Sequence, residues 1–218
     1  IFIIHVFIKN IMKIELEKKY FIVGIDEAGR GPLAGPVCVG AVGVKVKDKG
    51  EKIKTLEGIK DSKKLSAKKR EEWFKVLQEK PEFECHHVFV SHTAIDNFGI
   101  RKAVLFGVEK VLEKFSQKPD LVMLDGSLNA PEEYNQETII KGDEKIPLIS
   151  AGSIIAKVSR DIVMMNMHKK YPEYCFNEHK GYGTKKHFEK IIKHGFCDIH
   201  RKTFCGNVEA LRRNDNCV

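Results

Sequence analysis

The fold of this chain is decided near its start by the stretch Gly24-Ile25-Asp26-Glu27-Ala28-Gly29-Arg30-Gly31-Pro32-Leu33-Ala34-Gly35-Pro36. The apolar run of residues 20–25 predicts a buried strand that delivers two adjacent carboxylates. Neighbouring side chains of a strand point to opposite faces, so Asp26 and Glu27 share a site only if one comes from the strand and the other from the turn. Paired carboxylates suit a hard divalent cation, and a glycine-rich turn with an arginine suits a phosphate. Together they indicate phosphodiester chemistry.

The same turn also matches the glycine pattern of a dinucleotide-binding fold, with Asp48 at a suitable distance. That fold needs a helix directly after the turn, with its N-terminus on the pyrophosphate. Here Pro32 and Pro36 interrupt the turn, and the valine- and glycine-rich run 37–46 predicts a second strand, antiparallel to the first. The dinucleotide interpretation therefore lacks its required context.

Composition indicates one globular unit with a real core. The chain has 218 residues, of which 42% are hydrophobic and 31% charged. No apolar run reaches the roughly 18 residues of a membrane span. The six cysteines form no C-x-x-C pair, which argues against structural zinc and a disulfide framework and favours reduced thiols in a cytoplasmic protein. Residues 1–11 are apolar and precede Met12, and we expect them to lie outside the fold.

Positive charge is concentrated in the last part of the chain. The net charge is +8, and residues 157–218 hold 13 Lys and Arg against 7 Asp and Glu. This asymmetry favours an anionic partner, nucleic acid before membrane, because no basic amphipathic helix stands out. On charge alone, a solvated basic surface is an equally good explanation.

Hydrophobic periodicity predicts a mixed α/β architecture. The expected strands are 20–26, 37–46, 83–90, 121–124 and 138–140. The expected helices are one from Ser66 to Pro81, one over 93–115, one over 149–170 capped by Ser150 or Ser153, one from Thr184 to Gly195, and a last one through Val208 and Leu211.

Two further acids follow predicted strands. Asp125 comes directly after 121–124, and Asp143 follows 138–140 closely. Alone, each is most often a turn former, since Asp-Gly is a common turn dipeptide. With Asp26 and Glu27 they make four carboxylates, which could hold two divalent cations about 4 Å apart for in-line phosphoryl displacement.

A third candidate element is the loop His179-Lys180-Gly181-Tyr182-Gly183-Thr184. A lone tyrosine usually packs in a core. Between two glycines on a loop, Tyr182 can instead lie flat against a sugar or base.

Six motifs in this order resemble the ribonuclease HII family, over about residues 14–213. They are Asp26–Val37 (DEAGRGPLAGPV), Asp61–Ser66 (DSKKLS), Lys141–Asp143 (KGD), Ser153–Asp161 (SIIAKVSRD), His179–Thr184 (HKGYGT) and His200–Phe204 (HRKTF). The resemblance implies a ribonuclease H-like mixed sheet flanked by helices. It implies a catalytic core over 12–165 and a helical, substrate-binding C-terminal part over 166–218.

The activity implied is endonucleolytic, with Mg²⁺ or Mn²⁺. The enzyme would cut RNA within RNA–DNA hybrids and on the 5′ side of single ribonucleotides embedded in DNA, leaving 5′-phosphates, and we expect a monomer. The family's metal-site acids fall on Asp26, Glu27, Asp125 and Asp143. Its nucleic-acid contacts fall on Gly29, Arg30 and Gly31, and the tyrosine that senses the RNA–DNA junction falls on Tyr182. Basic candidates for holding the duplex are Lys180, Lys185, Lys186 and Arg201.

Some positions depart from the family or compete with these assignments. Gly152 stands where the family usually has Ala, which we expect to loosen its helix. Asp161 is spaced to pair with Lys157 and is assigned a structural role. The sister family, ribonuclease HIII, shares the motifs but usually carries an extra N-terminal domain, and the residues ahead of Asp26 leave no room for one. A non-catalytic binding protein with this fold is a further alternative, although all four acids are present.

Overall fold

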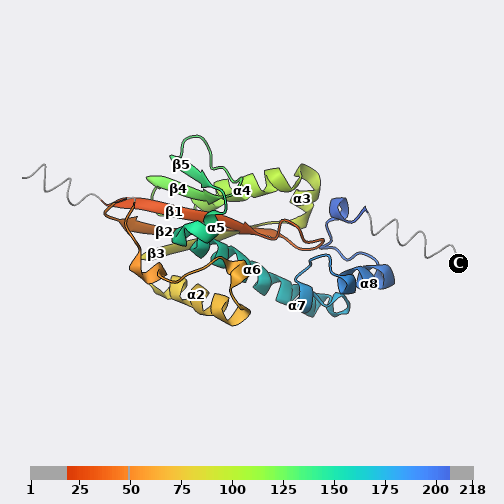
Figure 1. The fold of residues 1–218 in the computed structure, drawn as a ribbon. Coiled ribbons are helices and arrows are strands. Elements are labelled where there is room, and N and C mark those ends of the chain that lie inside the picture. The colour runs from red at the N-terminus through yellow and green to blue at the C-terminus, as the bar shows by residue number, and fades with distance from the viewer. Residues whose placement is uncertain (1–18, 49, 207–218) are drawn as a thin grey trace, which may run out of the picture.

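The computed structural model describes residues 19–48 and 50–206, and its centre is a five-stranded mixed sheet (Figure 1). The strands are β1 (Tyr20–Ala28), β2 (Val37–Val46), β3 (Phe83–Val90), β4 (Leu121–Asp125) and β5 (Gln136–Ile139), in the order β3-β2-β1-β4-β5. β1 is antiparallel to β2 and parallel to β4. The predicted strands and the antiparallel second strand are confirmed.

Side chains of β1 alternate between two cores, one on each face of the sheet. Phe21, Val23 and Ile25 pack in the same cluster as α4 (Ile100–Leu112). Ile22 packs on the opposite face, in the cluster of α6 (Pro147–Lys170). The central strand is therefore buried on both sides, which explains why its sequence is a continuous apolar run.

The remaining helices surround these layers (Figure 1). They are η1 (Lys54–Leu56), η2 (Ser62–Lys64), α2 (Ala67–Glu79), α3 (His92–Phe98), α5 (Gly142–Lys145), η3 (Pro172–Tyr174), α7 (Phe176–His179), α8 (Lys185–His194) and η4 (Lys202–Phe204). Ser66 and Thr184 cap α2 and α8 as expected, and Gly195 ends α8 with a positive φ. No helix of the described residues combines the length and hydropathy needed to cross a bilayer.

Besides the fifth strand, expected over 138–140 but spanning Gln136–Ile139, three predicted boundaries are wrong. β1 continues to Ala28, so both adjacent acids belong to the strand rather than one to the turn. The helix expected over 93–115 is two helices, because Gly99 adopts φ 81° between α3 and α4. α6 begins at Pro147, so Ser150 and Ser153 lie buried inside the helix instead of capping it.

The chain after α6 packs onto the turn that follows β1. Leu33 and Ala34 of the turn share a third cluster with Met164, Phe176 and Ile191. α6 crosses residue 165 without a break, and the division into two parts there stays a prediction. The segment 1–11 and the helix through Val208 and Leu211 lie outside the described residues.

Candidate metal and nucleic-acid site

Three carboxylates meet where β1 and β4 end. Ile25 is in register with Leu124 on the parallel neighbour, so the next residues, Asp26 and Asp125, lie side by side. Asp143 joins them from α5. Each of the three offers an oxygen, and these oxygens lie within 4.8 Å of one another.

Asp26 is the buried centre of this acidic group. Only 2% of its surface is exposed. Its Oδ1 accepts the Glu27 N–H at 2.7 Å, whereas Oδ2 accepts no hydrogen bond of ordinary geometry from the described residues. Burial raises the pKa of Asp26 well above its usual range, and the charges of Glu27 and Asp125 raise it further. A buried oxygen without a partner among other carboxylates fits a hard divalent cation, which would supply the missing positive charge.

The other two acids are held by their neighbours. Asp125 Oδ1 accepts the N–H groups of Gly142 and Asp143 at 2.6 and 3.3 Å, which ties α5 to the end of β4. Lys63 Nζ lies 3.2 Å from Asp143 Oδ2. Lys141 enters α5 with φ 56°, a left-handed conformation that turns the chain toward β4. Asp143 thus comes from a short helix rather than directly from a strand end.

Glu27 lies outside the three-carboxylate group. Because it follows Asp26 within the strand, its side chain starts from the opposite face of the sheet. Glu27 Oε1 instead pairs with Arg30 Nη1 at 3.3 Å. Its charge still reaches Asp26, whose pKa it raises.

The glycine-rich turn packs tightly against α6 on one side and is open on the other. Gly29 has φ 97°, and a Cβ there would lie 2.1 Å from Arg160 Nε. Gly31 is exposed, and a Cβ there would have no atom of the described residues within 4 Å. The open side, with half-buried Arg30, is free to meet a ligand.

Tyr182 lies beside this turn with 40% of its surface exposed. The Leu33 N–H donates to the Gly181 carbonyl at 2.8 Å, which joins the two loops directly. Lys157 Nζ and the Arg160 guanidinium lie 5.8 and 5.6 Å from the centre of the tyrosine ring. Two cations therefore stabilise the ring while much of it faces solvent.

The basic candidates differ in their surroundings. Lys185 is exposed, and Lys186 Nζ pairs with Glu178 at 2.6 Å. Lys180 is half-buried, and its ammonium donates to the Asn177 carbonyl. Arg201 is fully buried and donates to backbone carbonyls, so its prediction as a duplex contact is wrong. The sequence could not show this, because nothing in the residues around Arg201 distinguishes a buried arginine from one on the surface.

Asp161 has the structural role that its spacing predicts. Its Oδ1 accepts from Lys157 Nζ at 2.7 Å, one turn earlier on α6. Among the described residues, Asp161 is not part of the acidic group.

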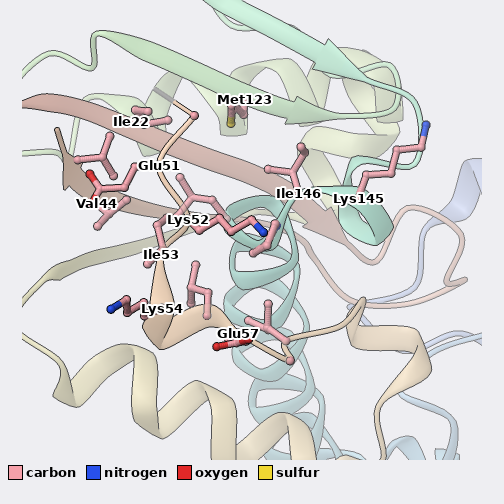
Figure 2. Close-up of a pocket in the computed structure, with 17 residues that line it drawn as sticks. Ile22, Val44, Glu51, Lys52, Ile53, Lys54, Glu57, Met123, Lys145 and Ile146 are labelled. Atoms are coloured by element: carbon pink, nitrogen blue, oxygen red, sulfur yellow. The ribbon is translucent and has the colours of Figure 1, made fainter. Parts of the chain in front are cut away.

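A separate cleft of about 820 Å³ lies between residues 50–59, the sheet and the start of α6 (Figure 2). Ile22, Val44, Met123 and Ile146 give it an apolar lining, with lysines at its edge. None of the three carboxylates lines it. The cleft is a gap in the hydrophobic cluster between the sheet and α6, and it is not part of the acidic site.

Sequence reasoning missed several polar residues that shape the site. Lys63 lies in the motif Asp61–Ser66, but its ion pair with Asp143 joins residues far apart in the chain and could not be predicted from local sequence. Arg160 gave no signal of its burial, because it occurs in a charged stretch of α6. His187 and His200 are buried together. His200 begins the motif His200–Phe204, whereas His187 lies outside the quoted motifs and has no signal in the sequence.

Comparisons with known proteins agree with this geometry. The family model for ribonuclease HII matches residues 23–207. The chain is 43% identical over 192 residues to ribonuclease HII of Caldicellulosiruptor bescii, covering 88% of this chain and 89% of that one. The crystal structure of ribonuclease H2 from Pyrococcus horikoshii OT3 is 27% identical, with a TM-score of 0.72 over 88% of this chain and 99% of that one.

A ribonuclease HIII, Bst-RNase HIII in complex with Mn²⁺, has a similar fold. Its TM-score is 0.64 at 15% identity, over 89% of this chain and 71% of that chain. This likeness concerns the fold alone, whereas the family model and the curated relative concern the sequence. The chain belongs to the ribonuclease HII family of metal-dependent endoribonucleases.

Proposed function

We propose that this chain hydrolyses the RNA strand of RNA–DNA hybrids and cuts on the 5′ side of single ribonucleotides embedded in duplex DNA. The observation that carries the proposal is the buried, unpartnered Asp26 oxygen beside Asp125 and Asp143. It lies at the end of the strand that leads into the open turn, which packs beside Tyr182. A metal site next to a phosphate-binding turn and a stacking ring suits cleavage within a duplex.

Asp26, Asp125 and Asp143 would hold Mg²⁺ or Mn²⁺, with Glu27 as the fourth acid that the family resemblance implies. Bound divalent ions would supply an activated water and charge stabilisation at the leaving oxygen. Asp125 also holds the N-terminus of α5 in place, which keeps Asp143 in position. The bond broken is that between O3′ and phosphorus, so the product carries a 5′-phosphate.

The turn and the tyrosine would read the substrate. Within the described residues no hydrogen bond uses the N–H of Arg30 or of Gly31, so both groups are available to a phosphate or a 2′-hydroxyl. Tyr182 would lie against the sugar next to the ribonucleotide. Lys180, Lys185 and Lys186 in the C-terminal part would hold the duplex through phosphates, so binding should weaken as salt is raised.

Removing the Asp125 carboxylate tests the proposal. Asp125→Asn should reduce cleavage at least about 1000-fold with little loss of hybrid binding, because it removes a metal ligand but no phosphate contact. The assay compares a DNA duplex containing one ribonucleotide with a full hybrid, in Mg²⁺ and in Mn²⁺ separately. The control is Asp48→Asn, an acid remote from the site, which should cleave at the wild-type rate. Undiminished turnover by Asp125→Asn would remove the basis of the two-metal mechanism.

The same assay separates the alternative of a non-catalytic binding protein. In that case, the wild type would bind the hybrid and cut neither substrate in either metal.

A further inference from the structure

The segment His200-Arg201 is buried between the turn and the tyrosine loop, although it contacts neither the acids nor the open surface. His200 exposes 2% of its surface and Arg201 none. The function proposed above gives this dipeptide no role. Its contacts nevertheless reach both elements that would read the substrate.

Arg201 binds the turn from the inside. Its guanidinium and Nε donate to three carbonyls, those of Gly29, Arg30 and Gly35, at 2.7, 2.9 and 2.9 Å. Its backbone N–H donates to the Leu33 carbonyl at 2.7 Å. Within the described residues no carboxylate forms an ion pair with Arg201, so the turn's carbonyl dipoles take the place of a counter-ion.

This contact decides where the turn's N–H groups point. In a trans peptide, the C=O and the following N–H point in opposite directions. The carbonyls of Gly29 and Arg30 both point at Arg201, so the N–H groups of Arg30 and Gly31 point away from it. Neither of these N–H groups has a partner in the described residues.

His200 connects to the tyrosine loop through a second histidine. The Cys197 N–H donates to His200 Nδ1 at 2.9 Å, which leaves the proton of neutral His200 on Nε2. Nε2 donates to His187 Nε2 at 3.1 Å, so neutral His187 carries its proton on Nδ1. Nδ1 then donates to the Tyr182 carbonyl at 3.0 Å. The Cys197 thiol and carbonyl also lie 3.2 Å from His200 Nδ1, and the Tyr182 carbonyl, which can only accept, fixes the proton of His187 on Nδ1.

We propose that His200-Arg201 is a positioning element that fixes the turn and Tyr182 relative to each other. Arg201 directs the turn's N–H groups outward, and His200 acts through His187 on the loop that carries Tyr182. The inference rests on the proposed function for its catalytic consequence. Its structural part, the ordering of two loops by two adjacent side chains, can be measured without substrate.

The first measurement is amide hydrogen exchange in the free protein. Arg201→Lys keeps the charge but cannot reach three carbonyls, so the amides of Leu33 and Gly35 should exchange about 10 to 100 times faster, the equivalent of losing one or two charge-assisted hydrogen bonds. Lys202→Gln alters the exposed neighbour and should leave these rates unchanged. Wild-type exchange at Leu33 and Gly35 in Arg201→Lys would overturn the inference, whether or not the protein cleaves RNA.

The second measurement is a double-mutant cycle on cleavage of the single-ribonucleotide duplex. His200→Phe keeps a ring but removes both nitrogens, and kcat/KM should fall about 10-fold, while the thermal shift caused by Mn²⁺ stays that of the wild type. In a Tyr182→Ala background the same substitution should have almost no effect, because its target is gone. Additive effects in the cycle, or a lost Mn²⁺ shift, would assign His200 a merely structural role. If the wild type cleaves nothing, the proposed function fails, and the exchange rates alone decide this inference.

Discussion

Tyr182 combines an exposed ring with a backbone that is held by hydrogen bonds. Its ring covers Lys157 and Arg160, while its carbonyl is held by His187. Tyr182→Ala should therefore change substrate choice more than stability. We expect the preference for a single ribonucleotide over a full hybrid to fall about 10-fold, since stacking of one base or sugar contributes about 1–3 kcal/mol.

The ratio of kcat/KM for the two substrates measures this preference. Tyr182→Phe is the matched variant, because it keeps the ring and removes only the hydroxyl. If Tyr182→Ala discriminates as well as the wild type, the tyrosine only packs against its two cations.

Asp26 illustrates a residue kept at a cost to stability. Burial and two neighbouring carboxylates oppose its charge, and Oδ2 accepts no hydrogen bond of ordinary geometry from the described residues. In the presence of a chelator, Asp26→Asn should be more stable than the wild type by about 1 kcal/mol, because it removes a buried charge without changing shape. Urea unfolding with EDTA measures this difference.

Adding Mn²⁺ should reverse that order. The ion stabilises the wild type by binding the folded state and gives the Asn variant much less. Equal Mn²⁺ shifts in the two proteins would place the metal elsewhere. Asp48→Asn again serves as the control, because its carboxylate is exposed.

The sequence predicted the positions of the acids better than it predicted the residues that hold the site in place. Asp26 and Asp125 could be expected to meet, because each ends an apolar run and such runs pair in a sheet. Glu27 pairs with Arg30 because the strand runs two residues beyond its predicted end, a difference that a boundary estimate from sequence does not resolve. The buried Arg201 had no local signal at all, since its partners are carbonyls about 170 residues away.

At the scale of elements, α6 approaches the sheet so closely that no side chain fits at three glycine positions. A Cβ on Gly40 would lie 2.4 Å from the Ala156 nitrogen, and one on Gly24 would lie 2.4 Å from the Leu148 backbone. Gly152 faces them, with a Cβ there 2.9 Å from the Gly24 carbonyl oxygen. The expectation that Gly152 merely loosens α6 is therefore incomplete, because its missing side chain permits this contact.

Gly40→Ala should destabilise the protein by about 1–3 kcal/mol, since backbone atoms on both sides must move to admit a methyl group. Chemical unfolding gives the difference, with Gly50→Ala as the control. A Cβ on Gly50 would have its nearest neighbour at 3.8 Å. Equal stability of the two variants would mean that α6 can shift away from the sheet without cost.

Helix positions were predicted more reliably than helix ends. The apolar spacing of 93–115 continues across Gly99, so periodicity alone could not show that the chain turns there. Ser150 and Ser153 resembled caps because serine favours that position. In the structure Ser150 donates to the Asp143 carbonyl and Ser153 bonds Ser62, so both serve the packing of α6 against its neighbours.

At the scale of the whole molecule, the buried histidines couple folding to pH. Burial lowers the pKa of His187 to about 3 and that of His200 to about 4, with nearby His179 adding to both shifts. In the unfolded chain these groups have a pKa of about 6.5. The unfolded state therefore binds more protons below pH 6.5. The contribution of these two histidines to the free energy of unfolding is fully present above that pH and is lost as the pH decreases toward 4.

When the pH falls from 7 to 5, we expect each of these two histidines to lower the free energy of unfolding by about 2 kcal/mol. The final pH lies about 1.5 units below the pKa of the unfolded chain, and each unit corresponds to about 1.36 kcal/mol. Urea unfolding followed by circular dichroism at both pH values measures the loss. Asp26, whose pKa is raised, gains stability as the pH falls and partly offsets it. The decisive comparison is therefore with His200→Phe, which retains Asp26 and should lose about 2 kcal/mol less than the wild type. Equal losses in the two proteins would show that His200 is already charged in the folded state, which contradicts the neutral relay to Tyr182.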